Sequence, residues 1–351
     1  MITSTALRYP AFRLVRADTD LPSRQYTTDV SWRPVPFSST IDVARVAEEF
    51  ERGATIVLQA LHLHHAPVAR FARELEQDLA QAVQVNAYYT PRAAQGLPVH
   101  HDTHDVICLQ VAGAKRWLVY EPALELPLKD QRYRPELGKP GEPVFDATLG
   151  PGDTLYLPRG WLHEALTSES DSLHLTVGLS PYTWFEAVKS ALEECAGELA
   201  YRRTVPERGQ TDEDLLALLE ERLRPEEVRR RRRDRLIRTR RPILDDQFEQ
   251  VRALERLTSD TPVERRPTVV AALTETGVVF EGREVVVPEH AREELEGLFH
   301  ASGPVAAREL SGNLDVDGRL VLVRRLVREG FLRVADPRRD EGAPPRTGAG
   351  A

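Results

Sequence analysis

The stretch VHHDTHDVICLQVAGAKRW, residues 99–117, decides how the chain is organised. It begins with a His-x-Asp pair, His100 and Asp102, and continues into an apolar run. In a β-strand the side chains at positions i and i+2 point to one face, so these two groups can reach the same ion. A further histidine, His163, follows the Pro-Arg-Gly turn of a second run, GPGDTLYLPRGWLHEALTSESDSLHLT, at residues 150–176. The spacing predicts a metal site.

Two imidazoles and one carboxylate on a β-framework form the facial triad that holds Fe(II) with open positions. We therefore predict His100, Asp102 and His163 as metal ligands, the first two leading a strand and the third in the loop after another strand. A carboxylate at the mouth of an apolar barrel is costly without a cation, which favours this interpretation over three unrelated side chains. The neighbouring His101 and His104 are excluded, because one points to the opposite face and the other lies one strand step further along.

The region around these residues has the pattern of a β-rich domain. Residues 83–180 alternate turn residues with short apolar runs: VNAYYT, VICLQVA, RWLVY, TLYLP and LHLTVGL. Many short strands with Gly and Pro turns indicate a sandwich or barrel. Before them, residues 41–52 and 68–82 have apolar residues at helical intervals, and residues 54–60 are typical of a buried strand. The expected class is α+β, with a first domain at residues 1–182.

After Pro181 the apolar period becomes helical, and we expect a helical segment at residues 183–260. Helices are predicted at 184–203, at 215–223 and around 244–257. The arginine run at 228–241, VRRRRRDRLIRTRR, is either a solvated helix face balanced by nearby acidic residues or a patch that contacts phosphate or RNA. Because the apolar stripes have no partner within the segment, we expect a homodimer.

Residues 261–337 form a separate small unit. A β-pair at 277–287, a helix at 289–301, a helix that Gly330 stops and a strand at 331–334 follow in the order of a winged helix. DNA binding stays possible but is not favoured; the arginines that keep it open are Arg319, Arg324, Arg325 and Arg328. The Gly/Pro/Ala-rich end, residues 338–351, is predicted to be a disordered tail.

Composition sets further bounds. A chain of 351 residues has room for two or three domains, and a net charge of -8 argues against wholesale nucleic-acid binding. Cys108 and Cys195 are far apart and form no CxxC pair, which indicates neither a disulfide framework nor a zinc knuckle. There is no membrane-length apolar stretch and no basic-then-apolar signal pattern. We expect a cytoplasmic protein with no membrane partner.

A charged residue stands at the far end of the opening stretch. Lys115 follows a Gly-Ala turn, on a strand expected beside the metal strand. If it points into the barrel, a buried lysine needs an anion, and a 2-oxo acid on the metal would supply one. The alternative is an ordinary surface lysine at a hairpin.

These motifs together resemble a known family. The run NAYYTPRAAQGLPVHHDTHDVICLQVAGAKRWLVYEP, with PGDTLYLPRGWLHEA and SLHLTVGL, is similar to the JmjC-type cupins of the ribosomal oxygenase family. The resemblance implies a double-stranded β-helix (jelly-roll), a helical dimerisation segment and a C-terminal winged helix. It also implies an enzyme, an Fe(II)- and 2-oxoglutarate-dependent dioxygenase that uses O2 to hydroxylate an Arg or His side chain of a ribosomal protein.

By the same resemblance, Lys115 matches the residue that pairs with the distal carboxylate of 2-oxoglutarate. Asn86, Tyr88 and Thr176 match polar positions that line the pocket, and the alternative for them is local hydrogen bonding within strands. Three rivals stay open: a hydroxylase of another peptide such as a biosynthetic precursor, an N-methyl-lysine demethylase, and a non-enzymatic metal-binding cupin with a DNA-reading winged helix.

Overall fold

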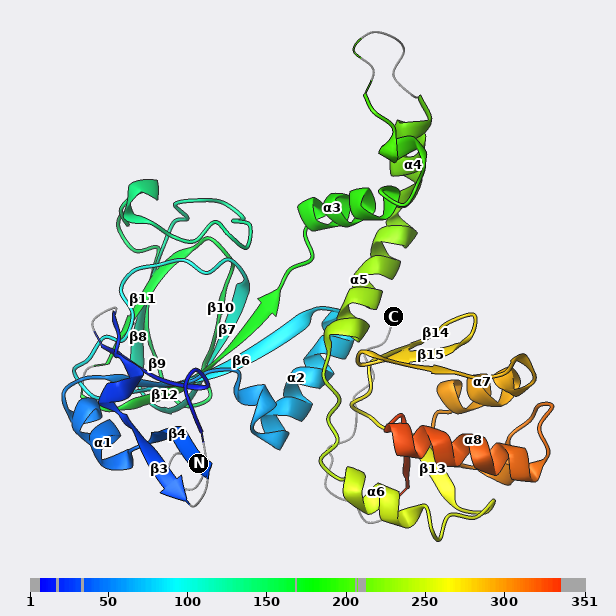
Figure 1. Ribbon diagram of the computed structural model, residues 1–351. Helices are drawn as coiled ribbons and strands as arrows, with labels where there is room; N and C mark the ends of the chain where they lie inside the picture. Colours follow the sequence, from blue (N-terminus) through cyan, green and yellow to red (C-terminus); the bar gives the residue numbers. More distant parts are fainter. Residues whose placement is uncertain are drawn as a thin grey trace. The chain divides into compact units, whose positions relative to one another are not determined.

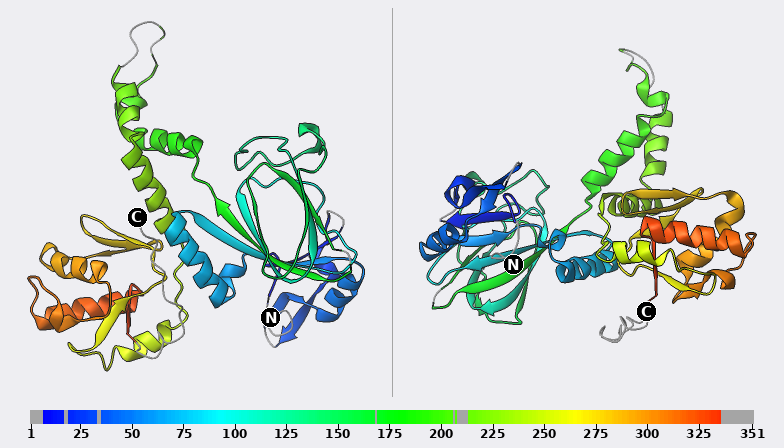
Figure 2. Two further views of the ribbon diagram at one scale, coloured as in Figure 1. Left: turned by 180° about the vertical axis from the view of Figure 1, so that it is seen from behind. Right: turned by 60° about the horizontal axis from the view of Figure 1, so that its bottom comes forward.

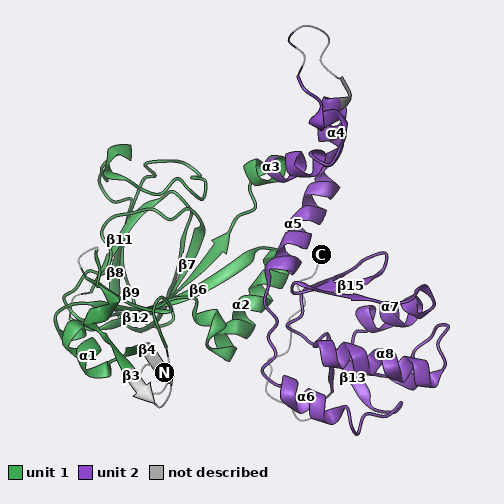
Figure 3. Ribbon diagram, in the orientation of Figure 1, with its two compact units in different colours: residues 1–188 green, residues 189–351 purple. Residues whose placement is uncertain are grey.

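The computed structural model describes residues 7–16, 19–32, 35–167, 169–205, 207 and 213–335 (Figure 1). The chain divides into two compact units, residues 1–188 and 189–351 (Figure 3). The tail predicted at 338–351 lies outside the described residues. None of the described helices is long and apolar enough to cross a bilayer.

The N-terminal unit is built mainly from two sheets, and in both of them all neighbouring strands are antiparallel. The larger sheet has the order β10-β7-β12-β6-β5-β1-β2 and the smaller has the order β11-β8-β9. The larger contains β1 (Phe12–Arg16), β2 (Thr19–Asp20), β5 (Thr55–Leu58), β6 (Ala82–Thr90), β7 (Asp105–Gly113), β10 (Thr154–Leu157) and β12 (Ser172–Ser180). The smaller contains β8 (Lys115–Tyr120), β9 (Phe145–Leu149) and β11 (Leu162–Leu166). All five apolar runs predicted as strands are strands.

The two sheets curve around a common interior (Figures 1 and 2). Alternating side chains of β7 and β8 fill it, with Cys108, Trp117 and Val119 in one buried cluster. Residues of the opposite parity on β6 and β12, such as Val85 and Val177, pack outward against helix α2 (Ala66–Leu79). This period-two alternation separates a barrel interior from an outer, helix-covered face.

The remaining elements of this unit are short. Helix α1 (Val43–Glu51) begins where the Asp42 carboxylate accepts hydrogen bonds from the first-turn amides, and Gly53, with φ of +94°, follows its end. Strands β3 (Thr27–Trp32) and β4 (Val35–Ile41) form a separate pair. The helices predicted at 41–52 and 68–82 are confirmed, with ends shifted by one to three residues.

The helices that follow are α3 (Trp184–Cys195), α4 (Glu213–Arg222), α5 (Pro225–Thr239) and α6 (Gln247–Ala253). The arginine run therefore has a helix of its own, and α3 ends earlier than predicted. Arg230 pairs with Glu227 at 2.8 Å and with Asp234 at 3.1 Å, as expected for a solvated helix face. Arg231 differs: its side chain is buried and lies 3.6 Å from Glu194.

The C-terminal unit also contains two three-stranded sheets, β17-β13-β18 and β14-β15-β16. Its elements are β13 (Pro262–Arg265), β14 (Ala271–Leu273), β15 (Gly277–Phe280), β16 (Arg283–Val286), α7 (Arg292–His300), β17 (Val305–Ala306), α8 (Val316–Glu329) and β18 (Leu332–Val334). The core includes Phe280, Leu326 and Phe331. The predicted β-pair, both helices and the last strand are confirmed, whereas β13, β14 and β17 were not predicted.

Candidate metal centre

The three predicted metal ligands come together in the N-terminal unit. One ligand atom from each of His100, Asp102 and His163 lies within 4.8 Å of the others. The main chains of His100 and His163 form an isolated antiparallel bridge, with N–H to O distances of 3.1 and 2.8 Å. The carbonyl of Asp102 accepts a hydrogen bond from the amide of Gly160 at 3.0 Å. Backbone pairing thus positions all three side chains.

Two details of the sequence prediction are wrong. His100 and Asp102 do not lead a strand, since β7 begins only at Asp105, and His163 lies within β11 instead of in a loop. The Pro-Arg-Gly turn before His163 is real, but the five residues that begin at Leu162 form a strand because they pair with β8. Such long-range pairing leaves little local trace in a short segment.

Hydrogen bonds fix which nitrogen of each histidine can bind a metal. The Nδ1–H of His100 donates to the carbonyl of Pro98 at 2.7 Å, and the Nδ1–H of His163 donates to the carbonyl of Trp161 at 3.0 Å. Because carbonyls only accept, each ring keeps its Nε2 lone pair free. Burial, together with the neighbouring His100, lowers the pKa of His163 to about 4, so this imidazole is neutral at pH 7.

Lys115 points into the barrel. Its side chain is 5% exposed, and its Nζ donates to the Thr90 hydroxyl at 3.1 Å. Burial lowers the pKa of Lys115 to about 8. The surface-hairpin alternative is therefore wrong, and the barrel contains both a buried cation and the three candidate metal ligands.

The other predicted pocket residues lie on β6 and β12. Burial raises the pKa of Tyr88 to about 12, and its hydroxyl is hydrogen-bonded to Thr176. The Oδ1 of Asn86 accepts from the amide of Ala60 at 2.9 Å and from Gln84 at 3.2 Å. Tyr88 and Thr176 thus form one polar pair, whereas the side-chain oxygen of Asn86 fixes the segment before α2 through the amide of Ala60.

Two residues that sequence reasoning did not single out as site residues share this interior. His174 stacks on Tyr88 at 5.1 Å between ring centroids, and Trp117 stands edge-on to His174 at 5.4 Å. Trp117 also lies 6.2 Å from the ring of His163. By the i, i+2 rule, Trp117 lies on the same strand face as Lys115, and His174 lies on the same strand face as Thr176.

One of the two excluded histidines, His101, has another role. His101 is buried, and its Nε2–H donates to the carbonyl of Gln131 at 3.0 Å while its ring packs edge-on against Tyr133. Among the described residues it is no member of the metal-binding group. His101 therefore fastens the connection between β8 and β9 to the segment that contains His100 and Asp102.

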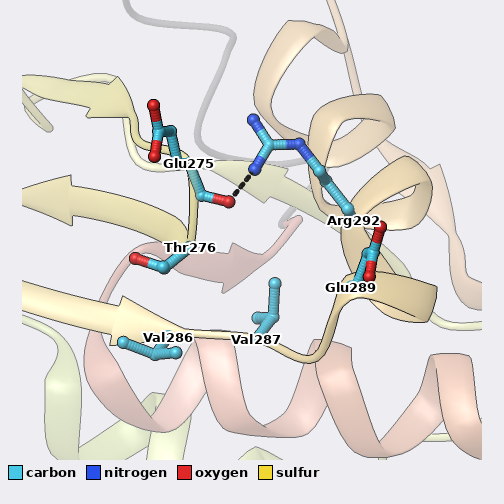
Figure 4. Close-up of a pocket in the computed structure, with 6 residues that line it drawn as sticks. All are labelled: Glu275, Thr276, Val286, Val287, Glu289 and Arg292. Carbon is cyan, nitrogen blue, oxygen red and sulfur yellow. Dashed lines mark hydrogen bonds between the residues drawn. The ribbon is translucent and has the colours of Figure 1, made fainter.

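A surface hollow of about 470 Å³ lies in the C-terminal unit, between the β15–β16 hairpin and α7 (Figure 4). Its lining is Glu275, Thr276, Val286, Val287, Glu289 and Arg292. The guanidinium of Arg292 donates to the carbonyl of Glu275 and, at 2.9 Å, to the Glu296 carboxylate. The hollow contains none of the predicted site residues.

Comparison with known proteins agrees with this geometry. Residues 60–187 match the JmjC domain family, and the match contains all three candidate ligands and Lys115. The predicted resemblance to JmjC-type cupins is confirmed.

Curated relatives of the JmjC domain include a bifunctional lysine-specific demethylase and histidyl-hydroxylase NO66 from Drosophila persimilis, 36% identical over 129 residues. That match covers 36% of this chain and 19% of the relative. Ribosomal oxygenase 2 of Rattus norvegicus is 41% identical over 110 residues, covering 31% of this chain and 23% of the relative. The chain thus spans only about a fifth to a quarter of these relatives.

Solved structures resemble the chain over most of its length. The Escherichia coli ribosomal oxygenase YcfD has a TM-score of 0.54 at 17% identity, covering 95% of this chain and 88% of that one. Another structure of YcfD, in complex with cobalt and 2-oxoglutarate, has a TM-score of 0.53 at 18% identity, with the same coverage. At such identities the likeness concerns the fold, a JmjC cupin-like arrangement of helices and sheets.

Proposed function

We propose that the chain is an Fe(II)- and 2-oxoglutarate-dependent dioxygenase that hydroxylates a protein side chain, with a ribosomal protein as its substrate. The observation that carries this proposal is the presence, in one barrel, of the triad His100, Asp102 and His163 and of a buried cation, Lys115. The names of the relatives, and the YcfD structure solved with cobalt and 2-oxoglutarate, support the same function.

The donor set fits Fe(II). Two imidazoles whose Nδ1 atoms are hydrogen-bonded to carbonyls offer Nε2 lone pairs, and Asp102 adds a carboxylate oxygen. A catalytic zinc site also uses three protein ligands, so the triad alone does not choose the metal. Lys115 favours Fe(II) over zinc, because a buried ammonium needs an anion, and a 2-oxo dicarboxylic acid chelated to Fe(II) supplies one.

Bound Fe(II) supplies the oxidation by O2 that is coupled to conversion of 2-oxoglutarate into succinate and CO2. The chain's own residues position the reactants. Lys115 pairs with the distal carboxylate of the co-substrate. Tyr88 stays protonated at neutral pH, and its hydroxyl stays hydrogen-bonded to Thr176. Apolar neighbours such as Cys108 and Val119 exclude water from the same interior.

The substrate class follows from the relatives. We propose an Arg or His side chain of a ribosomal protein, since one group of relatives is named ribosomal oxygenase and another histidyl-hydroxylase. The latter name also includes a lysine-specific demethylase, which makes removal of N-methyl groups from lysine the second candidate. Both reactions use the same triad and differ only in the C–H bond that is presented to it.

Mass spectrometry of ribosomal proteins tests the proposal. Ribosomes from cells with the wild-type gene should contain a protein heavier by one oxygen atom than in cells that lack the gene. Complementation with the His100→Ala variant should leave that protein unmodified. An unchanged ribosome in all three strains, with loss of methyl groups from a lysine-methylated peptide in vitro, would favour the demethylase instead.

We also propose that the chain forms a homodimer through its helical segment. On α3, Trp184 and Phe185 are 68% and 61% exposed, and Leu192 is exposed about two turns further along, whereas Ala187 and Ala191 are buried. Large apolar side chains on one helix face are characteristic of association surfaces. A second copy of the chain is the simplest partner for such a face.

The C-terminal unit is proposed to be a winged helix that serves protein contacts. Arg319, Arg324 and Arg325 of α8 donate hydrogen bonds to the main-chain carbonyls of Gly312, Leu257 and Val286, respectively. These contacts give each of the three guanidinium groups a structural role within the unit. The non-enzymatic rival, a DNA-reading module, therefore gains no support from them.

A further inference from the structure

Four buried polar side chains form the interior of the barrel beyond the metal centre. Lys115 and Trp117 come from β8, His174 from β12 and Gln110 from β7. Trp117 is 4% exposed, and His174 and Gln110 are each 3% exposed. Buried positions of this kind usually have apolar side chains, unless the polar atoms have hydrogen-bond partners.

Three of these side chains have a polar atom that lacks such a partner. Within the described residues, the indole Nε1 of Trp117 and the Nδ1 of His174 are buried without a hydrogen bond. Leaving one such group unsatisfied costs as much as a hydrogen bond contributes, and two in one interior indicate a ligand that completes them. Gln110 differs in the kind of atom left over: its amide nitrogen donates to the Ser172 hydroxyl and to the carbonyl of Ala112, both at 2.9 Å, and the atom without a hydrogen bond is its Oε1. An amide oxygen accepts hydrogen bonds and cannot donate to an anion.

Strand register places these two side chains between the metal and Lys115. His163 pairs with Val119 on β8, and Trp117 and Lys115 follow at successive inward-facing positions. On the other sheet, Tyr88 pairs with His174, and Thr90, which binds Lys115, pairs with Ser172 one layer further. A molecule that reaches from the metal to Lys115 must therefore pass Trp117 and His174.

His174 can donate one hydrogen bond in its neutral form. Burial, with Lys115 nearby, lowers its pKa well below the ordinary value, so the ring is neutral and has a single N–H. The indole of Trp117 can only donate. A carboxylate offers about four lone-pair sites, more than Lys115 alone can fill while its Nζ also bonds Thr90.

We propose that Trp117 and His174 are binding residues for the distal carboxylate of the 2-oxo dicarboxylic acid, and that with Lys115 they form a three-donor anion site. This inference rests on the proposed function. The two neutral N–H donors, together with the lysine cation, would make the site prefer 2-oxo acids with two carboxylates over those with one.

The test measures binding of 2-oxoglutarate and of pyruvate, a 2-oxo acid without a distal carboxylate, to the full chain loaded with Mn(II), by calorimetry without O2. His174→Phe keeps a planar ring against Tyr88 but has no ring nitrogen. Trp117→Phe keeps an aromatic ring and removes the indole N–H, which is the only polar group of the tryptophan side chain. Each should raise the Kd for 2-oxoglutarate about tenfold or more, the effect of one hydrogen bond to a charged group. The affinity for pyruvate should not change.

His174→Asn is the matched control, because an Asn side-chain nitrogen can stand near the position of Nδ1. It should restore the affinity for 2-oxoglutarate to within a few-fold of wild type. Equal losses for pyruvate and 2-oxoglutarate, or unchanged 2-oxoglutarate affinity in both Phe variants, would overturn the inference. If His174→Phe does not fold, Trp117→Phe decides it. A wild-type protein that binds neither acid would refute the proposed function itself, which is a separate outcome.

Discussion

Replacing Lys115 with methionine should make the ligand-free protein more stable while abolishing its response to 2-oxoglutarate. Lys115 is 5% exposed, and its ammonium has the Thr90 hydroxyl as a partner but no carboxylate within ion-pair distance among the described residues. A pKa that falls from 10.5 to about 8 corresponds to about 3 kcal/mol of folding free energy lost to burial of the charge. Methionine is similar in length and removes that cost.

The loss of one hydrogen bond, about 1 kcal/mol, opposes this gain. The Thr90 hydroxyl keeps a second partner in Thr55, at 3.2 Å. A net stabilisation of about 2 kcal/mol follows, which corresponds to a rise of about 4–8 °C in the Tm of a unit of this size. Differential scanning calorimetry at pH 7, with and without 2-oxoglutarate and Mn(II), measures both effects.

The pH dependence provides a second check. The folded-state pKa of Lys115 lies below its unfolded value, so the destabilisation is fully present below pH 8 and is relieved as pH rises from about 8 to 10.5. The stability advantage of Lys115→Met should therefore shrink over that range. Lys129→Met, at an exposed position, is the control and should change neither stability nor binding. A Lys115→Met protein with a lower Tm and intact 2-oxoglutarate binding would refute the reasoning.

Three further predictions concern the metal, the co-substrate and the dimer. Asp102→Ala removes the only anionic ligand and should reduce Mn(II) affinity at least tenfold by calorimetry, with little change in Tm of the metal-free protein, because Asp102 is partly exposed. Binding of 2-oxoglutarate should weaken up to tenfold per pH unit above about pH 8, as Lys115 loses its proton, and a flat profile would contradict this. Phe185→Glu should convert a dimer into a monomer in light scattering after gel filtration, whereas the exposed Glu193→Gln should not.

The residue types and spacing were sufficient to predict which three side chains come together, but not the way the chain positions them. A His-x-Asp pair and a later histidine indicate a metal site whatever their secondary structure. Their convergence depends on the bridge between His100 and His163, which are far apart in the sequence. The strand β11 is short, and its pairing with β8 is visible only in three dimensions.

The same limit explains why His174 and Trp117 were not predicted as site residues. In the sequence they look like ordinary members of apolar strands, and their significance lies in buried nitrogen atoms without partners. Whether a polar atom is satisfied depends on side chains from several strands, which no local pattern encodes. Arg231 shows the converse, since a residue from a charged run is buried against Glu194.

Anaerobic titration of the wild-type chain with Fe(II) and 2-oxoglutarate tests the central claim most directly. Chelation of a 2-oxo acid by iron that His100, Asp102 and His163 hold should produce a weak visible charge-transfer band, which saturates with 2-oxoglutarate and is absent in His100→Ala. The absence of a band in the wild-type protein, or an equal band in His100→Ala, would contradict the claim.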